Sequence, residues 1–136
     1  MKVFADTSGL FAFMVVNDLM YVRARENFRY FAERQARLMT SSLVLVETTA
    51  LLQRRIGMEA VHDFNRSIVP LMDVVWADSQ WHERAMRRLF LLNRQDVSLV
   101  DCLSFEIMEC HDIECAFTFD RHFEEQGFRI ATFHAS

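Results

Sequence analysis

Lysine, proline, glycine and long apolar runs are all scarce in this chain of 136 residues. Lys2 is the single lysine among 15 basic residues, so nearly all positive charge is arginine, which binds phosphate or carboxylate in bidentate fashion. Three glycines and one proline leave little room for long irregular loops. Charged residues interrupt the apolar runs well before the roughly 20 residues that a membrane span needs. We therefore expect a compact protein without a membrane segment.

An export signal and paired cysteines are also missing. Met1 and Lys2 lead directly into a short apolar run that meets Asp6, which is not the pattern of a signal peptide. The three cysteines are an odd number, which suits reduced thiols better than a disulfide framework. These features predict a soluble protein of the cytoplasm.

The charge balance bears on the function. A net charge of −4 is unusual for a nucleic-acid-binding protein, because the phosphate backbone is normally met by a basic surface. Metal ions can supply the missing positive potential, so the charge weakens a nuclease interpretation without excluding it. A hydrophobic content of 51% is ample for one core, and we expect a single domain over residues 1–136.

Strand-like and helical segments alternate along the chain. The expected strands cover residues 2–5, 38–40, 72–76, 115–119 and 128–131. The first expected helix starts near residue 7, the second covers residues 18–36, the third runs from Ser41 or Ser42 to near residue 57, and the fourth covers 58–68. Two more helices follow the caps Asp78 and Ser98, and a short helix or turn covers 120–126. This alternation predicts an α/β fold of three layers, with a short, mostly parallel sheet flanked by helices.

Four carboxylates are expected at one edge of that sheet. Asp6 and Asp120 each follow a predicted strand, Asp101 opens a helix, and Glu47 lies one turn into another. In such sheets ligands bind beyond the carboxyl ends of the strands, so the four side chains can point into the same place. They would repel one another unless some were protonated or a cation lay between them. Hard oxygen ligands favour Mg²⁺ or Mn²⁺ over zinc.

Each acid also has a purely structural explanation. Asp6 and Asp120 suit helix caps, Asp101 suits a helix dipole, and Glu47 suits a solvated surface. Glu47 fits that explanation least well, because its segment LVLVETTALL is apolar and a charge there needs a partner. The four acids together therefore favour a metal site more strongly than any one of them alone.

An acidic metal site suits phosphodiester hydrolysis. Metal ions lower the pKa of an attacking water, stabilise the charged transition state and neutralise the leaving oxygen. Thr7 and Thr118 stand beside two of the acids, where a hydroxyl can orient a carboxylate or a water. The pattern thus predicts a metal-dependent nuclease.

Four segments of the chain form a recognisable set: VFADTSGLFAF, SSLVLVETTALL, SLVDCLSFEIM and FTFDRHF. In order and spacing, over essentially the whole chain, they resemble the four blocks of the PIN-domain ribonucleases, especially the VapC-type toxins of bacterial toxin–antitoxin modules. The resemblance implies Mg²⁺- or Mn²⁺-dependent endonucleolytic cleavage of RNA, a homodimer, and a small antitoxin that reaches into the acidic groove. It assigns the metal-binding and catalytic acids to Asp6, Glu47, Asp101 and Asp120, and a helper hydroxyl to Thr7 or Ser8.

Three further expectations concern surfaces near the site and between subunits. Arg121 is a candidate for RNA binding, and Asp96 is a possible extra acid that fits better in the loop before Asp101. Large apolar side chains on the helices expected over residues 18–36 and 58–68 exceed what a small monomer easily buries, which also predicts a homodimer.

Other interpretations stay open. One is an RNA-processing PIN nuclease unrelated to toxicity. From a different class, a Mg²⁺-binding receiver module would need a lysine beside its aspartate, yet Lys2 precedes the first strand. A third is a catalytically silent interaction domain, but the presence of all four acids argues against it.

Two other groups of residues are weaker candidates for a site. A zinc site of Cys110, His111 and Cys115 would lack a second ligand pair. His122, close to Asp120, fits a polar residue flanking the site better than a general base.

Overall fold

A five-stranded parallel sheet forms the centre of the computed structural model, which describes residues 1–131. The strand order is β3-β2-β1-β4-β5, and every neighbouring pair is parallel. The strands are β1 (Lys2–Ala5), β2 (Arg37–Ser41), β3 (Met72–Val75), β4 (Cys115–Phe117) and β5 (Arg129–Ile130). The predicted α/β fold is confirmed; the last five residues of the predicted domain lie outside the described residues.

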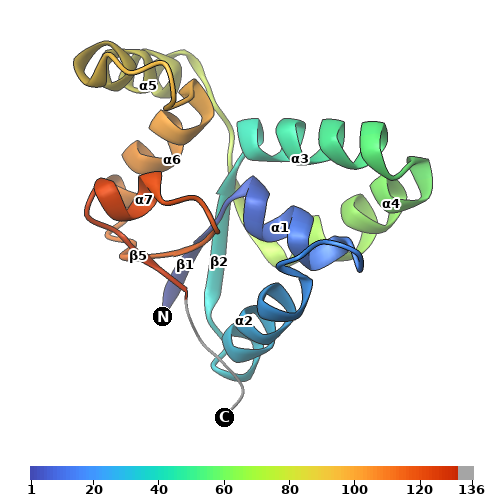
Figure 1. Ribbon diagram of the computed structural model, residues 1–136. Coiled ribbons are helices and arrows are strands. Elements are labelled where there is room, and N and C mark those ends of the chain that lie inside the picture. The colour runs from blue at the N-terminus through green and yellow to red at the C-terminus, as the bar shows by residue number, and fades with distance from the viewer. Residues whose placement is uncertain (132–136) are drawn as a thin grey trace.

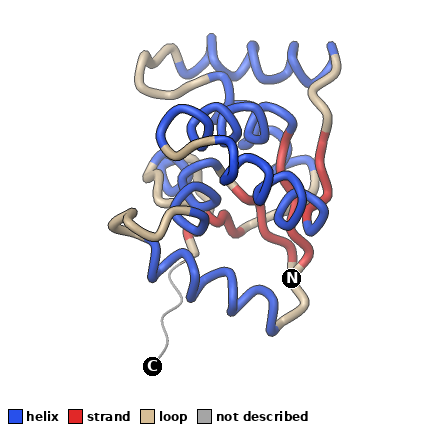
Figure 2. The backbone as a smooth tube through the Cα atoms, turned by 90° about the vertical axis from the view of Figure 1, so that its right-hand side faces the viewer, coloured by secondary structure: helices blue, strands red, loops and turns tan. Residues whose placement is uncertain are grey.

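Helices cover both faces of this sheet. Figure 1 shows α1, α3 and α4 on one side of β1 and β2, with α6 and α7 on the other. Figures 1 and 2 place α2 and α5 at opposite ends of the molecule. The helices are α1 (Thr7–Met14), α2 (Tyr21–Glu33), α3 (Ser42–Arg55), α4 (Met58–Asp63), α5 (Ser79–Leu92), α6 (Leu99–Cys110) and α7 (His122–Glu125). None of the helices within residues 1–131 is long and apolar enough to cross a membrane.

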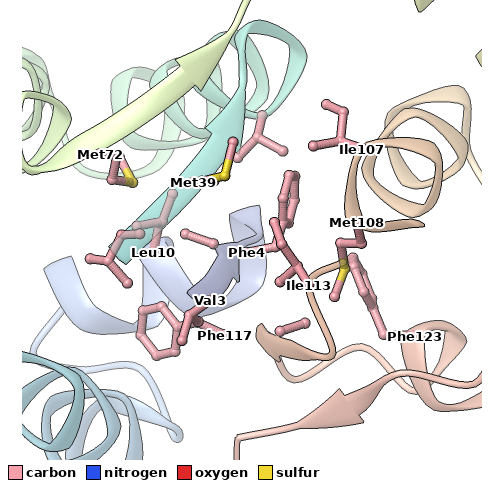
Figure 3. Close-up of a cluster of buried hydrophobic side chains, with 14 of the residues drawn as sticks. Val3, Phe4, Leu10, Met39, Met72, Ile107, Met108, Ile113, Phe117 and Phe123 are labelled. Carbon is pink, nitrogen blue, oxygen red and sulfur yellow. The ribbon is translucent and has the colours of Figure 1, made fainter. Parts of the chain in front are cut away.

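The core lies on both faces of the central strand, because successive side chains of a strand point to opposite sides. In Figure 3, Phe4 lies on the side of Ile107 and Met108 of α6, whereas Val3 lies on the opposite side with Phe117. All of these side chains are fully buried. The sheet is thus fixed from both sides, and its carboxyl edge is held in place for a site.

Local helix signals match the structure. The hydroxyl of Ser41 accepts the N–H of Val44 at the start of α3, and Asp78 caps α5 in the same way. Ser98 and Asp101 form a capping box at α6, in which each side chain accepts the backbone N–H of the other residue. The three cysteines are free, as predicted.

Several predicted elements are shorter in the structure: the helix expected over residues 18–36 covers Tyr21–Glu33, and the strand expected over 128–131 covers Arg129–Ile130. Two others end differently from the prediction. The helix expected over residues 58–68 ends at Asp63 and continues as a π-helical turn, Phe64–Ile68, followed by a short 3-10 helix that contains Pro70. Proline lacks the N–H that would continue the α-helix, and the wider turn keeps the buried side chains of Phe64 and Ile68 toward the core. The strand expected over residues 115–119 ends at Phe117, whose carbonyl accepts the N–H of Asp6 just after β1 ends.

Candidate active site

The four predicted acids line one cleft of about 400 Å³ at the carboxyl edge of the sheet. Asp6 follows β1, Asp101 lies in the first turn of α6, Asp120 precedes α7, and Glu47 projects from α3. Parallel strands and the helices that follow them bring these positions together from distant parts of the chain. The structure therefore places all four where the sequence argument expects them.

Asp6 is the most tightly held of the four. Its side chain is buried, and its Oδ2 atom accepts hydrogen bonds from Thr118 Oγ1 at 2.8 Å and Ser8 Oγ at 3.3 Å. The two hydroxyls are also 2.9 Å from each other. Ser8 and Thr118, rather than Thr7, are thus the hydroxyls that contact the Asp6 carboxylate. The hydroxyl of Thr7 instead accepts a hydrogen bond from Thr48 at 3.3 Å, which ties α1 to α3.

The electrostatics of the cleft disfavour charge on Asp6 and Asp101. Burial raises the pKa of Asp6 to about 7, against the hydrogen bond from Thr118 that lowers it, and the negative charges of Asp101 and Asp120 raise it further. Burial is also the main cause that raises the pKa of Asp101, and repulsion from Asp120 is the second. A cation among the carboxylates would remove this penalty, because an opposite charge favours the ionised form.

A histidine joins two of the acids. The ligand atoms of Asp101, Asp120 and His122 all lie within 4.8 Å of one another. Nδ1 of His122 is 2.9 Å from Asp120 Oδ1 and 3.9 Å from Asp101 Oδ2, yet this buried nitrogen makes no hydrogen bond with any of residues 1–131. His122 therefore lies in the site, whereas the sequence predicts it only at the flank, and its place two residues after Asp120 in TFDRHF is the signal that could have located it.

The other side of this imidazole is held by an ion-pair network. His122 Nε2 lies 3.2 Å from Asp96 Oδ2, and Arg94 grips the same carboxylate through two bonds of 2.6 and 3.0 Å. The hydrogen bond from Arg94 lowers the pKa of Asp96 to about 2. Burial disfavours charge on His122, but Asp120 and Asp96 outweigh it and raise its pKa. Asp96 therefore sits in the loop before α6, as expected, and supports His122.

Glu47 and Asp18 contribute carboxylates from the opposite wall. Glu47 is half-buried and makes no hydrogen bond or ion pair with any described residue. The apolar segment around it is not fully enclosed, since the next side chain back, Val46, is 67% exposed. Glu47 therefore faces the open cleft, and the expectation that an apolar surrounding forces a partner on it is wrong. Asp18, which the sequence argument missed, lines the cleft while its Oδ1 accepts the N–H of Met20 at 2.8 Å.

Three other candidates lie elsewhere. Arg121 is exposed and lines a neighbouring hollow rather than the acidic cleft. Lys2 binds the carbonyl of His111 at 3.0 Å at the start of β1, away from the edge where Asp6 lies, which does not suit a receiver module. Cys115 is buried in β4 whereas Cys110 is exposed, and the described residues hold no metal-ligand group at that segment.

Known proteins are similar to this chain in sequence and fold. A family model for the PIN domain matches residues 3–129. The chain is 33% identical over 129 residues to the 23S rRNA-specific endonuclease VapC20 of two strains of Mycobacterium tuberculosis, covering 93% of this chain and 95% of the relative. A crystal structure of Mycobacterium tuberculosis VapC20, described as a Sarcin-Ricin loop cleaving toxin, is similar with a TM-score of 0.80 and 30% identity, over 93% of this chain and 95% of that chain.

Proposed function

The chain belongs to the PIN-domain family, and on that premise we propose that it is an endoribonuclease, the toxin of a toxin–antitoxin pair. The match to the family model confirms the resemblance that the four sequence blocks indicated. The observation that carries the proposal is the cleft itself, in which Asp6, Glu47, Asp101 and Asp120 meet at the carboxyl edge of the sheet.

The donor set fits a divalent cation. Its atoms are hard carboxylate oxygens with one imidazole beside them, and burial together with repulsion among the acids raises the pKa values of Asp6 and Asp101, a penalty that a bound cation would offset. Asp6, Glu47, Asp101 and Asp120 would hold Mg²⁺ or Mn²⁺. When bound, such an ion polarises a water for attack on phosphorus and offsets the charge that develops on the phosphate oxygens.

The protein's own residues orient this chemistry. Thr118 and Ser8 hold Asp6 in one rotamer through its Oδ2 atom, so the carboxylate needs no rearrangement when substrate binds. His122, anchored by Asp96, lies against the Asp120 carboxylate and limits its movement. Because the cleft is shallow enough for Glu47 to remain half-exposed, an RNA strand can lie across it without entering a deep pocket.

Ribosomal RNA is the first substrate to test, because the related VapC20 is named for cleavage of 23S rRNA. We place the enzyme in the cytoplasm with its substrate. A small antitoxin would block it by inserting an arginine or lysine between the carboxylates, where the cation otherwise binds. The exposed apolar side chains of Val16, Leu19 and Val22, around the start of α2, support a homodimer.

The test is cleavage of ribosomal RNA by the purified protein. Activity should appear with Mg²⁺ or Mn²⁺, disappear in EDTA and be lost in Asp6→Asn. Equal activity in EDTA, or wild-type activity of the Asp6→Asn protein, would refute the metal-nuclease proposal. Expression of the chain alone should arrest growth, and co-expression of a small protein encoded beside it should relieve the arrest; harmless expression of active enzyme would favour the RNA-processing alternative.

A further inference from the structure

A second hollow, of about 230 Å³, adjoins the acidic cleft. The two share the side chains of Met20 and Phe119 as a common wall. Residues of α2, the segment before α7 and the end of β5 form the rest of the hollow. A chain-like ligand that crosses the acids can therefore continue directly into this second hollow.

The hollow is basic where the cleft is acidic. Arg23 of α2 and Arg121, directly before α7, both line it, with Glu124 as its single acid. Neither arginine forms an ion pair with a described residue. Six others do, namely Arg29, Arg37, Arg84, Arg88, Arg94 and Arg129. A guanidinium group that no carboxylate occupies is available to bind phosphate in bidentate fashion.

Phe119 adds an aromatic surface at the boundary of the two hollows. Its ring is partly exposed, and its backbone N–H donates to Ser8 Oγ at 2.9 Å, which fixes the main chain next to Asp120. Bases of single-stranded nucleic acid stack on such rings with little dependence on sequence. Two arginines that have no ion pair among residues 1–131, beside one aromatic ring, are thus the elements of a single-strand nucleotide site.

We propose that the hollow formed by Arg23, Phe119 and Arg121 is the subsite for the nucleotide next to the scissile phosphate. The two arginines bind its phosphate, and Phe119 stacks against its base. The subsite rests on the proposed nuclease function. It also accounts for RNA binding by a chain of net charge −4, because the acids bind the cation while the RNA-binding positive charge lies beside them.

Binding of a short single-stranded RNA, measured by fluorescence polarisation with Mg²⁺ in the cleavage-impaired Asp6→Asn protein, tests the subsite. Arg23→Gln and Arg121→Gln should each weaken binding about tenfold and lower the slope of log affinity against log salt by about 0.7. Phe119→Leu should weaken binding about fivefold or more without changing the slope. Arg87→Gln, an exposed arginine of α5 at the other end of the molecule, is the matched control and should change neither value.

Shortening the RNA locates the contact. When nucleotides are removed from one end of the RNA, Arg121→Gln should stop weakening the binding once the contacted phosphate is gone. When nucleotides are removed from the other end, Arg121→Gln should still weaken it. The subsite is refuted if the arginine variants behave like Arg87→Gln, or if their effect survives trimming of both ends. A wild-type protein that neither binds nor cleaves RNA with Mg²⁺ or Mn²⁺ would overturn the proposed function and the subsite together. Cleavage that is insensitive to Arg23 and Arg121 would overturn the subsite alone.

Discussion

The hydroxyl of Thr118 donates a 2.8 Å hydrogen bond to the carboxylate of Asp6 across 112 positions of sequence. The bond is buried between the ends of β1 and β4, where α1 packs closely on the sheet. A Cβ atom on Gly9 would lie 2.4 Å from the carbonyl oxygen of Phe117, so only glycine permits this approach. The same close packing positions Ser8 to bond both partners.

Removing this hydrogen bond should reduce activity while preserving the fold. Thr118→Val keeps the shape but leaves Asp6 without its strongest hydrogen-bond donor, and we expect RNA cleavage to fall by about 10- to 100-fold. Thr118→Ser retains the hydroxyl and should stay close to wild type. Cleavage rates at fixed Mn²⁺, with circular dichroism as a check on folding, compare the two variants; equal rates would show that the bond does not orient Asp6 for the reaction.

Amide substitutions should rank the four acids. Asp6→Asn, Asp101→Asn and Glu47→Gln should each lower cleavage by more than the roughly 100-fold typical of supporting residues, because each removes a proposed metal ligand. Asp120→Asn should have an equal or smaller effect. The melting temperature without metal should be unchanged or higher, since fewer like charges then crowd the cleft. Full activity of the Glu47→Gln protein would show that Glu47 is not a metal ligand that the reaction needs.

The stability of the metal-free protein should depend on pH through Asp6. The pKa of this group is about 7 in the folded chain against an ordinary value of 3.8, so between these values the folded state binds more protons than the unfolded state. The free energy of unfolding should therefore fall as the pH rises from about 4 to about 7, by a few kcal/mol at roughly 1.4 kcal/mol per pKa unit. Urea unfolding in EDTA measures this dependence.

Two additions to that measurement identify the source of the pH dependence. Asp6→Asn has no carboxyl to titrate and should flatten the curve over the same range. Mn²⁺ should restore stability at about pH 8, because an ion that binds the folded state alone stabilises it. A wild-type curve that is already flat in EDTA would mean that Asp6 ionises without cost.

His122 should contribute to metal binding. His122→Ala frees the Asp120 carboxylate and removes the nitrogen that lies 2.9 Å from it, so we expect Mn²⁺ affinity to fall by about 10- to 100-fold. His62→Ala, an exposed histidine of α4, should leave the affinity unchanged. Calorimetric titration with Mn²⁺ gives the affinity independently of cleavage. Identical Mn²⁺ affinities of the two variants would show that His122 does not contribute to metal binding.

The exposed apolar patch of Val16, Leu19 and Val22 should mediate self-association. Leu19 is 100% exposed, and Leu19→Asp should convert a dimer into a monomer in light scattering at micromolar concentration. Leu91→Asp is the matched control on α5, where the side chain is 80% exposed, and should leave the mass unchanged. A wild-type monomer at the same concentration would exclude the predicted homodimer under these conditions.

The order of elements, the helix caps and the family could be predicted from the sequence because each depends on local signals. Ser41, Asp78 and Ser98 cap their helices through bonds to residues three positions ahead, so a short window contains both partners. The positions of Asp6 and Asp120 after predicted strands, and of Asp101 at the start of a helix, indicated the carboxyl edge of a parallel sheet. That these acids and Glu47 bind a metal stays a prediction.

Tertiary structure decided what the local signals could not. The hydrogen bond of Thr118 to Asp6, the contact of His122 with Asp96, and the hollow that Arg121 shares with Arg23 all join segments far apart in sequence. The raised pKa of Asp6 likewise follows from its burial, which depends on the packing of α1 against β4. Sequence by itself determined which chemical groups reach this edge of the sheet. Only the folded chain determined their distances and dehydration, because both are set by the packing of side chains from every layer at once.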